Sequence, residues 1–245
     1  MDDKRHTHSE YNTLNTAALY AAGADIATVT HGVAALPIAH HILTHEHPGL
    51  FELSMHASAS ALDLVDGRTK NKAVRLASKV LFGVERDLRD PENRPSNLEK
   101  EALASYGIVD RPAWDERVDK GYFYAIAGAL LARAVKNGHH ATAGALGINL
   151  AVITMRDTVK TIERKEASKH DISVHATSTG KEKTKLQSVG VGILCSPLGR
   201  LASGRALGVG VLTYSTGLGI QDLRSYRRFV RHEKARKGKQ VGLIV

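Results

Sequence analysis

The sequence of 245 residues contains a single cysteine, Cys195. One cysteine excludes an intramolecular disulfide and any zinc site built from several thiolates. The glycines between 204 and 219 do not form the G-x-G-x-x-G pattern of a dinucleotide-binding loop, and no Ser/His/Asp or Cys/His nucleophile set stands out. Residues 1–4 are polar and acidic, so we expect no cleavable signal peptide. The chemistry must therefore come from other residue types.

Formal charge is missing from long stretches, although the net charge is +9 and the pI is about 9.7. Three stretches of 20, 19 and 16 residues contain no formal charge: Ile26–His45, Asn137–Met155 and Ala206–Gln221. Shorter apolar runs cover Gly121–Ala132 and Leu186–Gly199. A helix needs roughly 17–25 mostly apolar residues to span a bilayer. These runs are rich in Ala, Gly and Thr, which favours helices that pack on one another through small residues. Gly190, Gly192, Gly204 and Gly208 are the expected packing positions.

These patterns predict an all-α fold, a polytopic membrane bundle of six transmembrane helices. An even number of spans puts both termini on one side, where 28 lysines and arginines would lie against 4 on the other side. Because basic residues concentrate on the cytoplasmic side of membrane proteins, we expect a multi-pass protein of the inner cell membrane with cytoplasmic termini. The spans are expected at 16–39, 47–66, 120–135, 139–160, 184–203 and 206–222.

The expected domain organisation follows from these spans. Residues 1–15 form a cytoplasmic N-terminal segment, 16–222 the membrane domain and 223–245 a basic cytoplasmic tail. An expanded charged loop covers 68–114 and is expected to hold a short amphipathic helix at 72–86. The tail has eight basic residues between Arg224 and Lys239, which favours attraction to anionic lipid. Nucleic-acid binding is the alternative interpretation of such a tail, and we do not expect it.

Two pairs of carboxylates flank the loop. Asp63 and Asp66 close one apolar segment, and Asp115 and Asp119 open the next. Residues three or four apart share a helix face, so each pair can aim both carboxylates in one direction. Four such groups would make an oxygen cage for Mg²⁺ or Mn²⁺, the usual partner of a diphosphate substrate. The alternative for each pair is an ordinary helix end reaching water, where acids favour the first turn.

A group of cations follows downstream. Arg156 falls late in the fourth apolar run, where an arginine is costly and is therefore a functional candidate. Lys181 and Lys183 open the fifth run within Gly180–Gln187. Cations of this kind suit a phosphorylated ligand. Anchoring of the helix at the cytoplasmic face is the alternative for the two lysines.

Together these motifs resemble the CDP-alcohol phosphatidyltransferase family, whose signature reads D-x2-D-G-x2-A-R-x8-G-x3-D-x3-D. Asp63, Asp66, Gly67, Asp115 and Asp119 match it, and the resemblance covers about residues 12–230. Arg156-Asp157, Arg164 and Gly180-Lys181-x-Lys183-Thr184-x-x-Gln187 resemble the phosphatidylglycerophosphate synthase branch. A rival alignment of the second half uses Gly83, Asp87 and Asp90. We prefer Asp115 and Asp119 because an apolar run follows them directly.

The resemblance implies a metal-dependent transferase of phospholipid biosynthesis. It would move a phosphatidyl group from CDP-diacylglycerol to a small alcohol, with glycerol 3-phosphate favoured, and release CMP. Asp63, Asp66, Asp115 and Asp119 would hold Mg²⁺ or Mn²⁺, with Asp119 also the catalytic base. Gly67 and Arg75 would bind the nucleotide, and Arg156, Lys181 and Lys183 the acceptor phosphate. A homodimer is also implied.

Two other hypotheses stay open. The signature expects Ala and Arg at positions 70 and 71, where this chain has Lys70 and Asn71. This change motivates a catalytically impaired membrane relative that binds a lipid or a partner. The high pI motivates a soluble basic helical protein that binds nucleic acid.

Overall fold

The structure is a computed structural model that describes residues 7–45, 49–88, 90, 93–108, 113–169, 172 and 178–241. Side chains are described at all of these positions except 97, 113–116, 168, 178 and 237–241.

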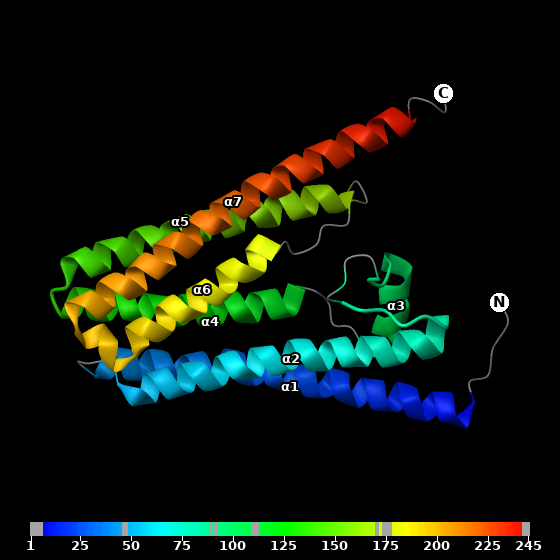
Figure 1. Ribbon diagram of the computed structural model, residues 1–245, viewed down its shortest axis with the longest axis horizontal. Helices are drawn as coiled ribbons and strands as arrows, with labels where there is room; N and C mark the ends of the chain where they lie inside the picture. Colours follow the sequence, from blue (N-terminus) through cyan, green and yellow to red (C-terminus); the bar gives the residue numbers. More distant parts are fainter. Residues whose placement is uncertain are drawn as a thin grey trace. The chain divides into compact units, whose positions relative to one another are not determined.

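Every regular element in the described part of the chain is helical, which confirms the all-α prediction (Figure 1). Six long helices follow the six predicted spans in order, and a short helix lies in the loop after the second. A 3-10 turn, η1, joins the last two long helices. The helices are α1 (His8–Thr44), α2 (Leu50–Phe82), α3 (Asn97–Ser105), α4 (Ala113–Lys136), α5 (His140–Lys169), α6 (Ser178–Cys195), η1 (Pro197–Arg200) and α7 (Ala202–Val241).

The chain divides into two compact units. Unit 1 comprises Met1–Ile38 and Met55–Ala125, and unit 2 comprises Ala39–Ser54 and Ile126–Val245. The predicted carboxylate residues all belong to unit 1. Arg156, Lys181 and Lys183 belong to unit 2.

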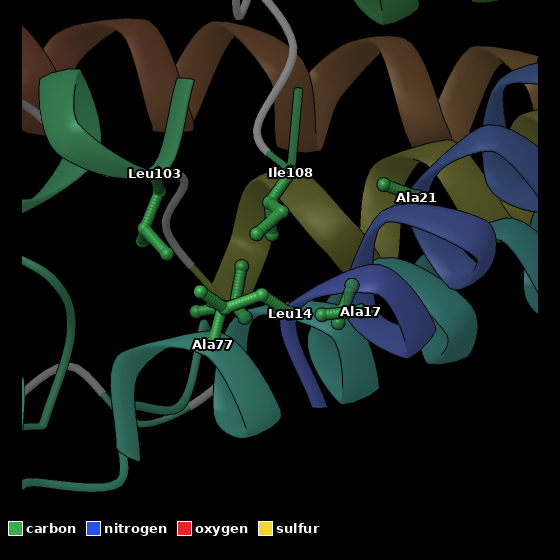
Figure 2. Packing of buried hydrophobic residues seen from close by; sticks show 8 residues of the cluster. Leu14, Ala17, Ala21, Ala77, Leu103 and Ile108 are labelled. Carbon is green, nitrogen blue, oxygen red and sulfur yellow. The ribbon is translucent and has the colours of Figure 1, made fainter. Parts of the chain in front are cut away.

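Unit 1 is built on an antiparallel pair, α1 and α2. The core cluster joins Leu14, Ala17 and Ala21 of α1 to Ala73, Val74 and Ala77 of α2, and Leu103 and Ile108 cover it from the α3 segment (Figure 2). Small alanines let two helix backbones approach closely. A capping box starts α3: Ser96 Oγ accepts the Glu99 N–H at 3.3 Å, and the Glu99 carboxylate accepts the Ser96 N–H at 2.7 Å.

In unit 2, α7 packs against both α5 and α6 (Figure 1). Glycines make the contact with α6: a Cβ on Gly190 would come 3.0 Å from the Gly208 carbonyl oxygen and 2.8 Å from Leu212 Cγ. A Cβ on Gly208 would come 2.7 Å from Leu194 Cγ. The prediction that Gly190 and Gly208 are packing positions is confirmed. Gly204 instead lies against the backbone of η1, where its Cβ would come 1.9 Å from the Leu198 carbonyl oxygen.

Several predicted helix ends are wrong. The segment 47–66 does not end at Asp66, because α2 runs on to Phe82 and absorbs the short helix predicted at 72–86. Its continuation is stabilised by Ala73, Ala77 and their neighbours, which are buried at helical spacing in the unit 1 core. Asp63, Asp66 and Gly67 therefore lie inside a helix.

The fifth predicted span, 184–203, is also misplaced, since α6 ends at Cys195. Pro197 cannot donate a backbone hydrogen bond. Ser196 Oγ accepts the Leu198 N–H at 3.2 Å and starts the 3-10 turn instead. The last predicted span and the first part of the basic tail form one helix, α7, which reaches Val241.

Within the described residues, one helix is long and apolar enough, by length and composition, to cross a membrane: α1. Many of its large apolar side chains are exposed, namely Leu19, Ile26, Val29, Val33, Leu36 and Leu43. The six-span bundle stays a prediction.

Candidate functional site

The α2 carboxylates of unit 1 have different surroundings. Asp63 is exposed, whereas Asp66 is buried. The Lys70 ammonium lies 3.4 Å from Asp66 Oδ1 and 4.0 Å from Asp25 Oδ1 of α1. A lysine thus stands between two carboxylates at the position where the signature expects alanine. Asp25 escaped the sequence analysis because its approach to Lys70 depends on the packing of two helices.

Asp119 lies in the second turn of α4, and its Oδ1 is 3.8 Å from Nε2 of His31 on α1. His31 is buried, and its Nδ1 lies 2.8 Å from the carbonyl oxygen of Ala59. Because a carbonyl only accepts, Nδ1 carries the proton, and Nε2 of a neutral His31 is left as an acceptor near Asp119. A second buried pair lies beside it, with His56 Nδ1 2.8 Å from the Tyr122 hydroxyl.

None of these aromatic and imidazole partners was predicted. His31 lies in an uncharged run without a motif. Its ring is tilted by 32° against the Tyr122 ring, with centroids 4.2 Å apart. Only the packing of α1 against α2 and α4 reveals it.

Oxygen donors of this kind suit a hard divalent cation. The side chain of Asp115 lies outside the described residues, although α4 begins at Ala113 and includes its backbone. Among the side chains that are described, no three His, Cys, Asp or Glu residues gather closely enough to hold a metal ion. Asp66 is paired with Lys70, and Asp119 lies beside His31. The cage of four aspartates therefore stays a prediction.

The two predicted nucleotide-binding residues are also in α2. A Cβ added to Gly67 would meet nothing within 4 Å, so packing does not require glycine there. Glycine inside a helix costs about 1 kcal/mol relative to alanine, and close approach of a ligand to the backbone would account for it. Arg75 is exposed and forms an ion pair with Glu85.

In unit 2, Arg156 is the centre of a cation cluster. The residue is only 5% exposed, and Nε and Nη2 donate to Asp157, with Nε at 2.9 Å. Gly219 of α7 makes room for the guanidinium, because a Cβ there would lie 2.1 Å from Nη1. Nη1 is buried and has no hydrogen-bond partner among the described residues. Buried donors are nearly always paired, so Nη1 is a candidate to bind a ligand.

Lys183 of α6 belongs to the same cluster. Burial is the largest cause that lowers the pKa of Lys183 to about 8, and the Arg156 charge is the next. One turn further along α6, Gln187 is buried, and its Nε2 also lacks a partner among the described residues. Lys160 of α5 donates to Asp222 of α7 at 2.5 Å. The cluster therefore combines a half-buried ammonium with a buried arginine N–H that has no partner in the described part of the chain.

Lys181 differs from Lys183. Its side chain is exposed, and residues two apart on a helix do not face each other. Of the three predicted phosphate ligands, the structure brings together Arg156 and Lys183. The sequence analysis includes Gln187 in a motif but does not assign it a role. Lys160, Gly219 and Asp222 could not be predicted, because they reach the cluster only through the packing of α5, α6 and α7.

Comparisons with protein-family models, with curated proteins and with solved structures found no match to this chain.

Proposed function

We propose that the protein is an integral membrane phosphotransferase that moves a phosphatidyl group from CDP-diacylglycerol to the hydroxyl of a small phosphorylated alcohol. Glycerol 3-phosphate is the favoured acceptor, and CMP is the leaving group. The observation that carries this proposal is the buried Arg156 close to Lys183, since Arg156 Nη1 has no hydrogen-bond partner among the described residues. Gln187 lies one turn from Lys183 on α6. All three occupy positions where the sequence resembles the phosphatidylglycerophosphate synthase branch.

Two cations and an amide donor suit a phosphate dianion better than a neutral alcohol. Arginine presents a planar fork of N–H donors that matches phosphate oxygens, and lysine adds a compact charge. A bound phosphate would also give Arg156 Nη1 the partner that it lacks among the described residues. We therefore assign the acceptor phosphate to these side chains in unit 2.

The carboxylates of unit 1 would serve the reacting phosphates and the acceptor hydroxyl. Asp63, Asp66, Asp115 and Asp119 would hold Mg²⁺ or Mn²⁺, which would neutralise charge on the diphosphate. Asp119 would take the proton from the attacking hydroxyl as its oxygen bonds to the phosphatidyl phosphorus and the bond to CMP breaks. His31 Nε2 would accept that proton next, since its Nδ1 already donates to Ala59.

Membrane insertion is supported by the apolar length of α1 and by its exposed leucine, isoleucine and valine side chains. An exposed apolar surface of this kind indicates contact with lipid or with a partner. The multi-pass arrangement, the binding of anionic lipid by the basic tail and the homodimer are part of the proposal.

The test is CMP release by detergent-purified protein supplied with CDP-diacylglycerol and a divalent ion. Glycerol 3-phosphate, inositol phosphate, serine and water are compared as acceptors. We expect metal-dependent release with a phosphorylated acceptor and loss of turnover in Asp66→Ala. An unchanged rate in Asp66→Ala would refute the assignment of the metal site.

A second candidate is a catalytically impaired relative that binds lipid or a partner. The contact of Lys70 with Asp66 and Asp25 favours it, because an ammonium there competes with a divalent cation for the same carboxylate. Lys70→Ala separates the two candidates. If the protein is an active enzyme, the unsubstituted protein should release CMP. If it is an impaired relative, it should bind a divalent ion only after Lys70 is replaced by alanine.

A further inference from the structure

A cavity of about 380 Å³ lies within unit 2, at the turns that join α4 to α5 and α6 to α7. Three arginines line it: Arg133 of α4, Arg200 of η1 and Arg205 of α7. Asn137 and His139 of the α4–α5 turn add polar groups. None of the residues that line the cavity in the described part of the chain is acidic. The cavity therefore has the charge expected of an anion site.

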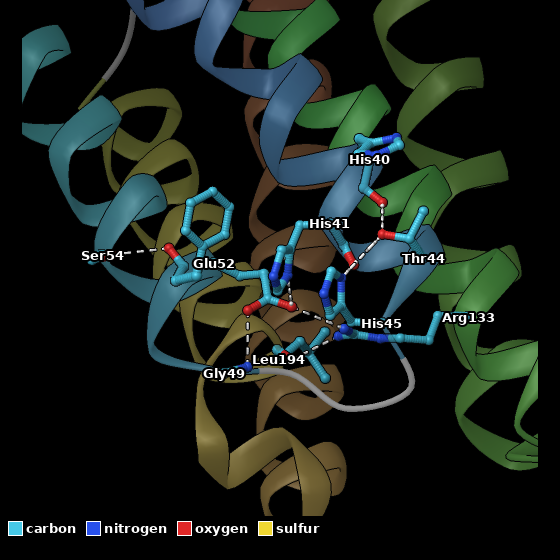
Figure 3. A network of polar contacts seen from close by, with 10 residues as sticks. His40, His41, Thr44, His45, Gly49, Glu52, Ser54, Arg133 and Leu194 are labelled. Atoms are coloured by element: carbon cyan, nitrogen blue, oxygen red, sulfur yellow. Dashed lines mark hydrogen bonds and ion pairs between the residues drawn. The ribbon is translucent and has the colours of Figure 1, made fainter.

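Arg133 lies at one wall of the cavity. It is buried, with Nη1 3.4 Å from Glu52 Oε1 and Nη2 3.4 Å from the Leu194 carbonyl oxygen (Figure 3). Glu52 is shared, because its carboxylate also lies 3.0 Å from His41 Nδ1 and accepts the Gly49 N–H at 2.9 Å. The single carboxylate thus serves three partners and balances only part of the positive charge around it.

Backbone oxygens orient Arg205 near the start of α7. Arg205 Nη1 donates to the carbonyl oxygen of Arg200 at 2.6 Å. Nη1 also donates to the carbonyl oxygen of Gly199 at 3.5 Å. A guanidinium has five N–H donors, so these two backbone bonds leave Arg205 with donors for a ligand. Arg200 is the last residue of η1, and Arg205 lies in the first turn of α7. The short connection between the two elements fixes the spacing of the two arginines.

Helix N-termini add to the positive potential. A neighbouring hollow of about 550 Å³ shares His139, Thr142 and Arg205 with the cavity and is lined by the first residues of α5 and α7, His140 and Ala202. The first turns of helices present N–H groups and a partial positive charge to anions. These turns reinforce the arginines.

The distribution of basic residues supports a ligand role. The predicted topology leaves four lysines and arginines on the non-cytoplasmic side, where they are disfavoured. Three of the four line this cavity, and the fourth, Lys136, is exposed and does not. The sorting of basic residues by side depends on the topology of the proposed function. The cavity and its three arginines do not depend on that topology.

We infer that the cavity binds a phosphate group, supplied either by a small phosphate ester or by the head group of an anionic phospholipid. Arginine forks bind phosphate oxygens in pairs. The cavity volume lies near the lower end of the range for small-molecule sites, roughly 300–1,000 Å³, which suits a head group or a small ester. The site is separate from the assigned acceptor residues Arg156 and Lys183, which do not line it.

Binding is measured on the detergent-purified full chain carrying Lys183→Gln, which weakens the assigned acceptor site. One arm titrates inorganic phosphate by calorimetry. The other compares thermal unfolding in nanodiscs of phosphatidylcholine with and without phosphatidylglycerol, because a ligand of the folded state raises the midpoint. Arg200→Gln and Arg205→Gln test the site. Lys136→Gln is the matched control, since it removes the same charge from the adjacent turn.

Loss of one charged contact should weaken binding about tenfold or more in the two arginine variants, with no change in the lysine control. A loss in the phosphate arm identifies a small ester, and a loss confined to phosphatidylglycerol identifies a lipid head group. Equal effects of all three substitutions, or no effect in either arm, would overturn the inference. No arm supplies CDP-diacylglycerol, so the outcome is independent of the proposed transferase activity.

Discussion

The substitution Gly219→Ala tests whether Arg156 positions the acceptor. Gly219 of α7 faces the Arg156 guanidinium, and an added Cβ would lie 2.1 Å from Nη1 and 3.1 Å from both Cδ and Cζ. Arg156 is buried, so its side chain cannot swing into solvent. The Cβ–Nη1 separation must grow by about 1.4 Å to reach ordinary van der Waals contact at about 3.5 Å.

Two effects on the free energy of unfolding oppose each other. Alanine is favoured over glycine inside a helix by about 1 kcal/mol, whereas overpacking of a filled site costs about 1–3 kcal/mol. We expect Gly219→Ala to destabilise the protein by about 0–2 kcal/mol. Gly217→Ala is the matched control on the same helix, because its Cβ would meet nothing within 4 Å. Gly217→Ala should therefore be stabilised by about 1 kcal/mol, the helix preference of alanine over glycine, without any cost of overpacking.

The kinetic effect should be larger than the effect on stability. Misplacing a positioning group by about an ångström can reduce the rate by up to about 100-fold. CMP release is the assay. We expect the KM for glycerol 3-phosphate to be about 10- to 100-fold higher in Gly219→Ala than in the wild type. The KM for CDP-diacylglycerol should not change. Wild-type kinetics in a folded Gly219→Ala protein would refute the role of Arg156. Equal losses in Gly217→Ala would indicate a general effect on α7.

Three further predictions follow from the described residues. The KM for a phosphorylated acceptor should rise as the pH passes about 8, because Lys183 is charged below its pKa of about 8 and neutral above it; Lys183→Arg should remove this dependence, and a rise only near pH 10 would contradict it. Gly67→Ala should raise thermal stability slightly yet raise the KM for CDP-diacylglycerol, since its Cβ meets no protein atom but would meet the nucleotide; an unchanged KM would exclude close approach of the nucleotide to this backbone. Extraction from membranes should require detergent, because α1 exposes large apolar side chains; release by high salt alone would favour a soluble nucleic-acid-binding protein.

Helix content and order could be predicted from the sequence because they depend on local composition. Uncharged runs rich in alanine and glycine mark the cores of α1, α5 and α7, and Gly190 and Gly208 mark a helix contact. Helix ends were less predictable. Past Asp66 the sequence becomes charged, yet α2 continues because its alanines are buried against α1. Tertiary packing overrides the local signal there.

The candidate site was predictable only where a motif carried it. Arg156 and Lys183 were found through their place beside apolar runs, and the structure brings them into one cluster. His31 and Asp25 could not be found in the same way. Each approaches a predicted residue, Asp119 or Lys70, across more than 40 positions of sequence. Such pairings are set by how α1 packs on α2 and α4.

Side chains of α2 hold the segment that follows this helix, and Asn71 is one of them. Asn71 occupies the position where the signature expects arginine, and its Oδ1 accepts the N–H of Leu88 at 2.8 Å. One turn later Arg75 pairs with Glu85, and Ser78 Oγ accepts the Arg86 N–H at 2.9 Å.

The face of α2 that the resemblance assigns to the nucleotide therefore also binds the segment that follows α2. The contacts are made by Asn71, Arg75 and Ser78. An arginine at 71 could not accept the Leu88 N–H, because a guanidinium has no acceptor. The hydrogen bond to Leu88 thus gives Asn71 a structural role. Asn71→Arg should release the 83–88 segment, seen as faster hydrogen exchange at the Leu88 amide. Unchanged protection at Leu88 would show that the loop does not depend on this side chain, and the departure from the signature would then favour the catalytically impaired relative.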